Sequence, residues 1–363
     1  MQFDYSHHLV GLIARVQSAA TRLAAADPDL RQAVADRSRR QAAMLSARLD
    51  GSPLSDDTVT RVDGGDVPAL EEPATGLGVG WARALNLERM ETQEAAAVEY
   101  ANLCRLADLE EELAPTCLSA PLDTLRRLHG IICQGLVDPG VIGSWRRTDQ
   151  AIHDGAQGMV IYNAPGPDRI QPAMAELGQW LQRRTLVMPV AVIAGIAHER
   201  ILEIQPFESG NGRVARVFAR LILRAGGIDT HGAAVLEAQL TADATGYYAE
   251  VAATMRRAGD LSRWLERHTG ALARALEQAA DVLDHRPRTA LPEPGRVIIA
   301  ELLPGKTINL REYAVDAHVD LRAARDDLIA FARAGELVEV PGGGGLSYMR
   351  PVASSGAASP AAE

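Results

Sequence analysis

The chain has 363 residues and a formal net charge of −10, which allows two or three domains and argues against a general nucleic-acid coat protein. Ala and Leu supply most of the apolar residues and aromatic residues make up 4% of the chain, so a mainly α fold is predicted rather than a sandwich or barrel. Cys104, Cys117 and Cys133 form no Cys-x-x-Cys pair, which is typical of free thiols in a reducing compartment. Met1 begins no signal peptide, and no apolar run approaches the roughly 18 residues of a membrane span, so a cytoplasmic protein is expected.

The N-terminal segment is predicted to be helical. Residues 9–49 carry amphipathic helical spacing that breaks near Asp27-Pro28. Gly51 then suits the first position after a helix, where a left-handed backbone is common. From Asp57 to Pro73 the chain is rich in Gly, Asp and Pro, which predicts an exposed linker.

Helical spacing of apolar residues recurs through the centre of the chain. His198 lies on the buried side of one such helix and is predicted to be a hydrogen-bonded core residue, since a catalytic role would need a partner brought close by the fold. Tyr247, Tyr248 and Trp264 are predicted to anchor the core. The predicted helices cover 92–109, 122–136, 171–184, a segment that starts at Pro189, and two segments within 242–283.

An extended pair of strands interrupts these helices. It is predicted to begin at Gly143-Ser144-Trp145-Arg146, to turn near His153-Asp154-Gly155 and to return along Met159–Tyr162. The pattern by itself is typical of a surface hairpin.

The stretch from Ile204 to Arg224 carries the strongest chemical signal. Gly210-Asn211-Gly212 forms a turn that small residues and Asn enter easily, and a helix follows it until Gly226-Gly227. Exposed amides of such a turn, a helix N-terminus and nearby arginines together make an anion site, here for a polyphosphate. A solvated basic stripe is the alternative. The arginines of this helix lie on one face and are Arg213, Arg216, Arg220 and Arg224.

The segment Q-P-F-E-S-G-N-G-R-V-A-R resembles the signature of Fic-domain proteins, H-x-F-x-[DE]-G-N-G-R-x-x-R. The matching residues are Phe207, Gly210, Asn211, Gly212, Arg213 and Arg216. Family members mostly transfer AMP from ATP, with Mg²⁺, to a Ser, Thr or Tyr hydroxyl of a protein. The resemblance implies that the Gly210–Gly212 amides bind the phosphates of ATP, with Arg213 and Arg216 beside them.

Two positions depart from the family signature. Gln205 replaces the histidine that takes the proton from the attacking hydroxyl, and an amide is not a base at neutral pH. Ser209 replaces the acidic residue that binds Mg²⁺, for which a lone hydroxyl is a poor substitute. Glu208 is one position out of phase and could bind the metal only if the loop shifted. The phosphate cradle is therefore predicted more firmly than the transfer reaction or the metal.

The resemblance extends to an inhibitory motif, [ST]-x-x-x-E-[GN], at Ser46, Asp50 and Gly51, where Asp50 replaces the usual Glu. In the family this carboxylate pairs with the second arginine of the signature, here Arg216, and blocks placement of the γ-phosphate. A polar helix end without such a role is the alternative reading. Because Asp is one methylene shorter than Glu, the resemblance implies a weaker or water-bridged clamp.

Two further parts of the chain have counterparts in the family. The hairpin with Trp145 and Arg146 resembles a flap that pairs by strand addition with the target protein. Three short helices and two strands in 295–350 resemble a winged helix-turn-helix domain. Its seven basic and eight acidic residues favour a protein contact or a homodimer over DNA binding, which stays open as the alternative.

Three functions fit these observations. The chain is either a Fic-type adenylyltransferase, a degenerate Fic domain that senses a nucleotide or phosphate ligand, or a transferase whose acceptor is not a hydroxyl. The predicted organisation, in chain order, is an N-terminal helical segment with the inhibitory motif (1–60), a linker (61–88), a Fic domain (89–285), a linker (286–294), a winged helix-turn-helix domain (295–350) and a disordered tail (351–363).

Overall fold

The computed structural model describes residues 2–70, 89–153, 160–184, 188–257, 259–284, 293–342 and 345–351. The protein is mainly helical, as the composition predicts, and it divides into two compact units, Met1–Leu283 and Asp284–Glu363. Among the described residues, no helix is long and apolar enough to cross a membrane.

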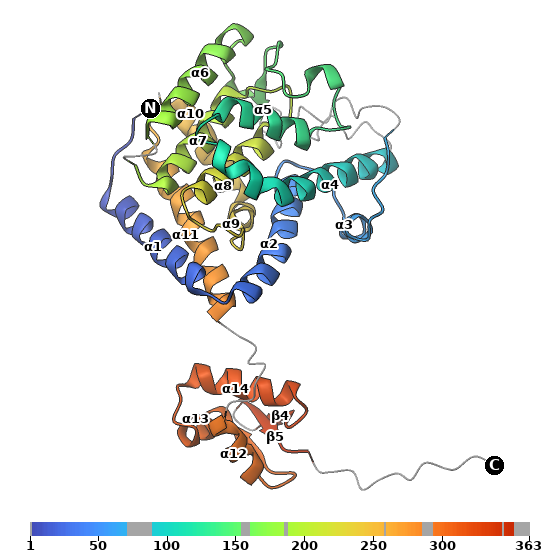
Figure 1. The fold of residues 1–363 in the computed structure, drawn as a ribbon, viewed down its shortest axis with the longest axis vertical. Helices are drawn as coiled ribbons and strands as arrows, with labels where there is room; N and C mark the ends of the chain where they lie inside the picture. Colours follow the sequence, from blue (N-terminus) through green and yellow to red (C-terminus); the bar gives the residue numbers. More distant parts are fainter. Residues whose placement is uncertain are drawn as a thin grey trace, which may run out of the picture. The chain divides into compact units, whose positions relative to one another are not determined.

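The first unit holds the elements that form the candidate site (Figure 1). Most of the predicted helices are found within a few residues of their expected ends. The elements are, in chain order, α1 (His7–Ala25), α2 (Pro28–Leu49), α3 (Asp56–Asp63), α4 (Arg89–Leu113), α5 (Pro121–Ile132), β1 (Ala151–His153), β2 (Val160–Asn163), α6 (Pro167–Arg184), α7 (Val190–Ile204), α8 (Asn211–Ala225), α9 (Leu236–Ala242), α10 (Ala244–Arg256) and α11 (Ser262–Asp284).

Helices α7 and α8 form the centre of this unit. Almost every residue of α7 is buried, because its sequence is apolar on all sides, and α8 buries both its apolar residues and its arginines. The two helices pack closely where α7 begins and α8 ends: a Cβ on Gly226 would lie 2.4 Å from Val190. This central pair fixes the loop 205–210 between them.

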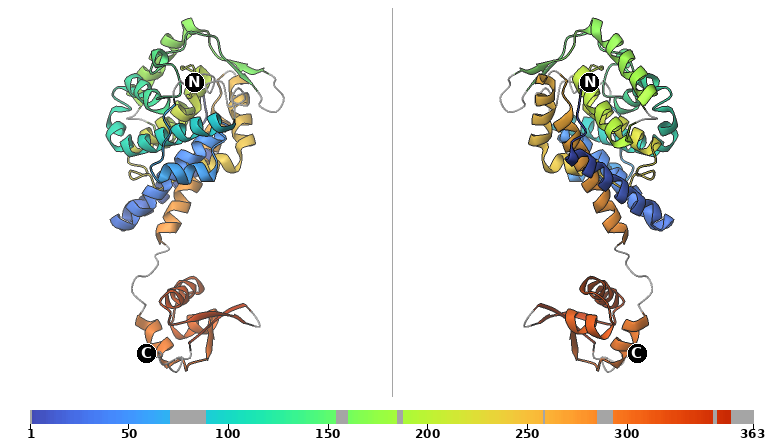
Figure 2. Two further views of the ribbon diagram at one scale, coloured as in Figure 1. Left: turned by 90° about the vertical axis from the view of Figure 1, so that its right-hand side faces the viewer. Right: turned by 90° about the vertical axis from the view of Figure 1, so that its left-hand side faces the viewer.

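The N-terminal helices wrap around this centre. Helix α1 runs beside α11 (Figure 2), and the contact includes ion pairs from Arg15 to Glu277 and from Arg22 to Asp281. Helix α2 begins after a cap by Asp27, whose carboxylate accepts N–H groups of the first turn, and it ends at Leu49 with Gly51 at φ 87°. The predicted break and helix end are therefore confirmed.

The predicted linker from Asp57 to Pro73 is wrong at its start. Ser55 caps a two-turn helix, α3, by accepting the N–H of Thr58, and Val62 is buried. Asp56 and Asp57 lie in the first turn of the helix, where their negative charges interact favourably with the helix dipole. Residues 64–70 follow without helix or strand, and the remainder of this linker (71–73) and of the predicted domain linker 61–88 lies outside the described residues.

Strands β1 and β2 form an antiparallel pair, and its register runs from Ala151 opposite Asn163 to His153 opposite Val160. The hairpin is therefore present, but its first strand starts at Ala151 and excludes Trp145 and Arg146. The predicted turn at Asp154–Gly155 lies outside the described residues.

Within its described residues, the second unit has three helices and a three-stranded antiparallel sheet in the order β3-β5-β4. Its own core includes Tyr313, Leu328, Phe331 and Tyr348. Strand β3 was not predicted. The elements are α12 (Glu293–Glu301), β3 (Thr307–Asn309), α13 (Leu310–Asp316), α14 (Leu321–Arg333), β4 (Val338–Gly342) and β5 (Gly345–Met349). The predicted linker 286–294 lies largely outside the described residues, as does nearly all of the predicted tail 351–363.

Buried titratable groups in the first unit predict a loss of stability at mildly acid pH. Burial lowers the pKa of His129 and of His268 to about 4 each, and it raises the pKa of Glu199 to about 7. As pH falls from 6.5 to 4, the unfolded chain takes up protons on both histidines that the folded chain refuses, which lowers the free energy of unfolding by about 3 kcal/mol per histidine. Glu199 acts in the opposite sense between pH 7 and 4.5 and offsets about one histidine.

We therefore expect a net loss of about 2 kcal/mol on acidification from pH 7 to pH 4.5, measured by urea unfolding at these two pH values. The loss should shrink in His268→Gln, because that side chain has no proton to gain. A free energy of unfolding that stays constant over this range would contradict the assignment of neutral buried histidines.

Candidate functional site

The loop between α7 and α8 begins at Gln205, which ends α7 in a left-handed conformation at φ 48°. Its backbone N–H bonds to Ile201 O at 2.9 Å, and its side-chain Nε2 donates to Leu202 O at 2.7 Å. Gln205 is buried, and its amide nitrogen is used to satisfy the end of α7. The residue at the position of the missing histidine therefore stabilises the loop and supplies no base.

Asn211 holds the loop in shape. Its Oδ1 accepts the N–H of Phe207 at 2.9 Å, and its Nδ2 donates to Phe207 O at 2.8 Å. The side chain thus replaces two backbone partners that an irregular buried loop would otherwise lack. Asn211 was predicted only as a residue that suits a turn. In the structure its side chain also makes two specific hydrogen bonds to the backbone of Phe207.

His129 of α5 was not among the predicted site residues. Its ring stacks on Phe207 with centroids 4.1 Å apart, and its Nδ1 accepts the N–H of Gly143 at 2.8 Å. The neutral ring therefore carries its proton on Nε2. In the sequence, His129 lies on the apolar face of the predicted helix 122–136. This position could have suggested that the histidine is buried near the site.

Helix α8 begins at an uncapped end. Its N-cap, Gly210, has φ 72° and has no side chain that could cap the first amides of the helix. Arg213 and Arg216 are 6% and 1% exposed, so they do not form a solvated stripe. We call the Gly210–Gly212 backbone together with these two arginines the cradle. An uncapped helix N-terminus with buried arginines has a strongly positive potential that favours an anion.

The carboxylate of Asp50, at the end of α2, supplies that negative charge. Asp50 Oδ1 lies 2.9 Å from Arg216 Nη2, and Oδ2 lies 3.3 Å from Arg213 Nε. A Cβ on Gly212 would lie 2.8 Å from both carboxylate oxygens, so only glycine lets the carboxylate approach this closely. The structure thus brings together the predicted inhibitory residue and the predicted arginine, by a direct ion pair rather than through water.

Ser46 completes the contact between α2 and α8. Arg216 donates from Nε to Ser46 Oγ and from Nη2 to Ser46 O, both at 2.9 Å. Burial is the largest single influence and lowers the pKa of Arg216, but the Asp50 carboxylate together with Tyr247 and Tyr248 raises it by more, so the net shift is upward. Arg216 is therefore charged, and Nη1 has no hydrogen-bond partner among the described residues.

Tyr248 was predicted to lie in the core, and this prediction is wrong. The residue lies instead beside Asp50, at the contact between α2 and α8. It is 43% exposed, unlike Tyr247 and Trp264, which are buried. Its hydroxyl donates to Leu49 O at 2.5 Å and lies 3.5 Å from Asp50 Oδ1. Tyr247 bonds to His198 Nε2 at 3.1 Å, so His198 is the hydrogen-bonded core residue that was predicted.

The candidate metal ligands do not fit Mg²⁺. Ser209 is buried and its Oγ lies 3.7 Å from Cys133 Sγ. The Glu208 carboxylate is occupied by the N–H of Arg147 at 3.0 Å and the hydroxyl of Thr148 at 2.6 Å. Across the described residues there is no cluster of three His, Cys, Asp or Glu side chains that could hold a metal ion. Mg²⁺ prefers carboxylate and phosphate oxygens, and the one carboxylate of this loop is already engaged in these two hydrogen bonds.

Arg146 and Trp145 are not flap residues. Arg146 is 2% exposed, and its guanidinium donates to the carbonyls of Gln205 (2.6 Å), Thr148 (2.5 Å) and Pro165 (2.5 Å). Trp145 packs on Phe207 with ring centroids 5.0 Å apart. Both residues therefore stabilise the loop 205–210. They precede the hairpin, whose first strand begins only at Ala151.

Replacing Arg146 by Met should therefore destabilise the protein. The change keeps most of the volume but leaves several buried carbonyls without a donor, at a cost of about 3 kcal/mol. Chemical unfolding measures the loss directly. Arg147→Met is the matched control, because Arg147 is the exposed neighbour that uses only its backbone N–H towards the loop. Equal stability of the two variants would contradict the role given to Arg146.

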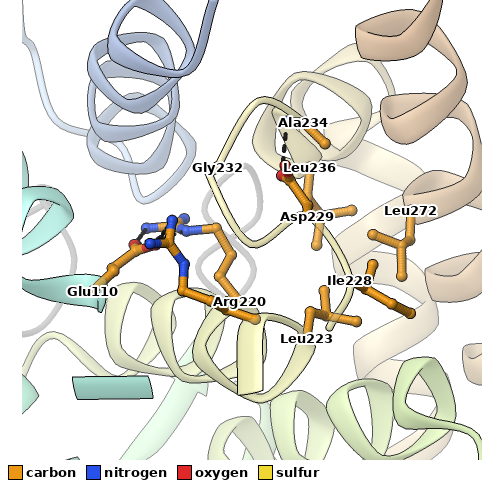
Figure 3. A pocket seen from close by; sticks show the side chains of 10 residues that line it. Glu110, Arg220, Leu223, Ile228, Asp229, Gly232, Ala234, Leu236 and Leu272 are labelled. Carbon is orange, nitrogen blue, oxygen red and sulfur yellow. Dashed lines mark hydrogen bonds and ion pairs between the residues drawn. The ribbon is translucent and has the colours of Figure 1, made fainter. Parts of the chain in front are cut away.

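The far end of α8 is closed by a separate group of charges (Figure 3). Arg220 pairs with Glu110 at 2.7 Å and with Glu237, and Arg224 lies 3.7 Å from Glu110. The cavity beside them has a volume of about 20 Å³, enough for a single water. These arginines were predicted to lie on the same helix face as Arg213 and Arg216, and in the structure they stabilise the packing of α8 and leave no room for a ligand.

Comparison with known proteins gives a consistent result for this region. Residues 118–223 match the sequence profile of the Fic/DOC family. A curated relative, a protein adenylyltransferase Fic from Culex quinquefasciatus, is 33% identical over 94 residues, which cover 25% of this chain and 17% of the relative. The match therefore spans about a sixth of that relative's length.

Two solved structures share the fold. A Fic family protein from Desulfovibrio desulfuricans G20 has a TM-score of 0.61 at 20% identity and covers 98% of both chains. A Fic-domain-containing signalling protein from Bacteroides thetaiotaomicron VPI-5482 has a TM-score of 0.55 at 17% identity, covering 75% of this chain and 95% of its own. Residues 118–223 thus match the Fic/DOC family, and the chain shares the fold of two solved Fic proteins.

Proposed function

We propose that this protein is a Fic-type nucleotide-binding protein whose phosphate site is held closed by Asp50. The observation that supports this most strongly is the Asp50 carboxylate against Gly212 and Arg216, at the uncapped start of α8. A carboxylate from another helix that satisfies two buried arginines is a ready substitute for a phosphate group. A phosphate of ATP or of a related nucleotide would bind there once Asp50 withdrew.

Transfer of AMP to a protein hydroxyl is the second candidate, and the name of the curated relative favours it. The geometry argues that such transfer is slow in this chain, because Gln205 supplies no base and its amide is bound to Leu202 O. Loss of a general base costs about 10²–10⁴ in rate. An acceptor that needs no base, such as an amine or thiolate, would avoid this cost.

The remaining elements suggest where partners would bind. The β1–β2 pair could add a strand from a target protein, because backbone pairing makes little demand on sequence. The three helices and sheet of the second unit suit a winged helix-turn-helix domain, and we propose that it contacts protein, including a second copy of this chain, rather than DNA. Metal-independent binding of the nucleotide follows from the engagement of Glu208 and Ser209.

Titration calorimetry with ATP and with AMP, with and without Mg²⁺, tests the proposed function. Binding should depend little on the metal and should be lost in Arg216→Met, since that change removes a buried charge from the cradle. Arg127→Met is the control, because Arg127 forms an exposed ion pair with Glu112 outside the cradle. Nucleotide binding that survives Arg216→Met would contradict the site.

A further inference from the structure

Glu99 of α4 is a second acid in contact with the cradle, and no predicted motif includes it. It is fully buried and its carboxylate pairs with Arg213 Nη1. Apart from this ion pair, neither carboxylate oxygen has a hydrogen-bond partner among the described residues. A buried carboxylate with one partner is costly to the fold unless that partner stays charged and close.

The two acids differ in how easily they could leave. Asp50 caps the end of α2, its side chain is 18% exposed, and the flexible Gly51 follows it. Glu99 lies within α4 between buried neighbours, among them Ala97 and Tyr100. A small shift of the end of α2 withdraws Asp50, whereas removal of Glu99 would require α4 to unpack. Glu99 therefore stays when a ligand replaces Asp50.

The charge that remains in the cradle follows from this difference. With Asp50 withdrawn, Arg213 and Arg216 give two positive charges and Glu99 gives one negative charge, a sum of +1. With the partial positive charge of the α8 N-terminus added, this sum comes close to balancing a single phosphate group of about −1.5 to −2, whereas the further phosphates of ATP would meet no positive partner in the cradle. A metal ion could compensate, but Ser209 and Glu208 do not fit one.

From this charge balance we infer that Glu99 makes the cradle selective for a nucleoside monophosphate over the corresponding triphosphate. The inference rests on the proposed function and adds the class of ligand. Glu99 acts through Arg213 by fixing its position and neutralising its charge, so it is a positioning residue that determines specificity. Its effect should appear in the ratio of two affinities rather than in either affinity alone.

The test uses the full chain with Asp50→Ala, so that the competing carboxylate is absent, and metal-free buffer with a chelator. Titration calorimetry with AMP, ADP and ATP should show AMP binding about tenfold tighter than ATP. Adding Glu99→Gln should reduce the AMP-to-ATP ratio by about tenfold, because the neutral amide leaves Arg213 free to pair with another phosphate. Glu110→Gln is the matched control, since Glu110 is also a buried acid of α4 that pairs with α8, at Arg220.

The outcomes separate this inference from the proposed function. If no nucleotide binds the Asp50→Ala protein, the proposed function fails and the inference with it. If nucleotides bind but ATP is preferred, or if Glu99→Gln leaves the ratio unchanged, only the role of Glu99 is overturned. Should Glu99→Gln not fold, the comparison of AMP with ATP in Asp50→Ala alone decides, because a preference for ATP would contradict the charge balance.

Discussion

Asp50→Ala should tighten nucleotide binding about 10–100-fold, because the carboxylate competes with the ligand from within the same molecule. Asp50 contacts Arg213, Arg216 and the Cα side of Gly212 at once, so it occupies the region that a phosphate needs. Its removal frees two arginines that are already positioned by Ser46 and Glu99. Calorimetry with AMP and ATP measures the change directly.

The same substitution should lower stability. A buried arginine that loses its acid typically costs about 3 kcal/mol, and bound nucleotide at a hundredfold excess over its Kd should restore about 2.7 kcal/mol. Asp36→Ala is the matched control, because Asp36 lies on the same helix and is exposed beside Arg39. If Asp50→Ala and Asp36→Ala bind nucleotide equally, then Asp50 does not close the site.

Gln205→His combined with Ser209→Asp should raise AMP transfer to protein hydroxyls by about 10²-fold or more over the wild-type chain. The backbone at position 205 is left-handed at φ 48°, a conformation that histidine enters more easily than most residues. The imidazole supplies the base that the Gln205 amide lacks, and the new Asp supplies a carboxylate for Mg²⁺. Transfer of label from α-labelled ATP to a panel of lysate proteins measures the gain.

Gln205→Asn with Ser209→Asp separates the base from the metal ligand. This control keeps an amide at position 205 and suits the left-handed backbone, so its rate should stay near that of the wild type. Vigorous labelling of a hydroxyl by the wild-type chain would contradict the account, since it would show that the fold supplies another base.

Local pattern predicted the elements that carry the cradle. The Gly210–Gly212 turn and the helix after it could be read from turn chemistry and helical spacing. The pairing of Asp50 with Arg216 followed from the resemblance to Fic proteins. Local sequence alone could not predict this pairing, because the motif that contains Asp50 is far from Arg216 in the chain: its first residue, Ser46, is 170 positions away.

The residues that were missed or wrongly placed act through contacts that are distant in sequence. Arg146 bonds to a carbonyl 59 positions away, so its place on the hairpin was a reasonable but wrong expectation. Glu99 and His129 resembled ordinary members of helices until the fold placed them against Arg213 and Phe207. The helix α3 was missed because its Gly- and Asp-rich surroundings masked a Ser55 cap.

The most direct test of a closed phosphate cradle is the crystal structure of the Asp50→Ala protein soaked with AMP. The account predicts the phosphate at the Gly210–Gly212 backbone, within hydrogen-bond distance of Arg216, with Glu99 still paired to Arg213. A phosphate bound elsewhere, or a cradle filled by other side chains of the protein, would contradict it.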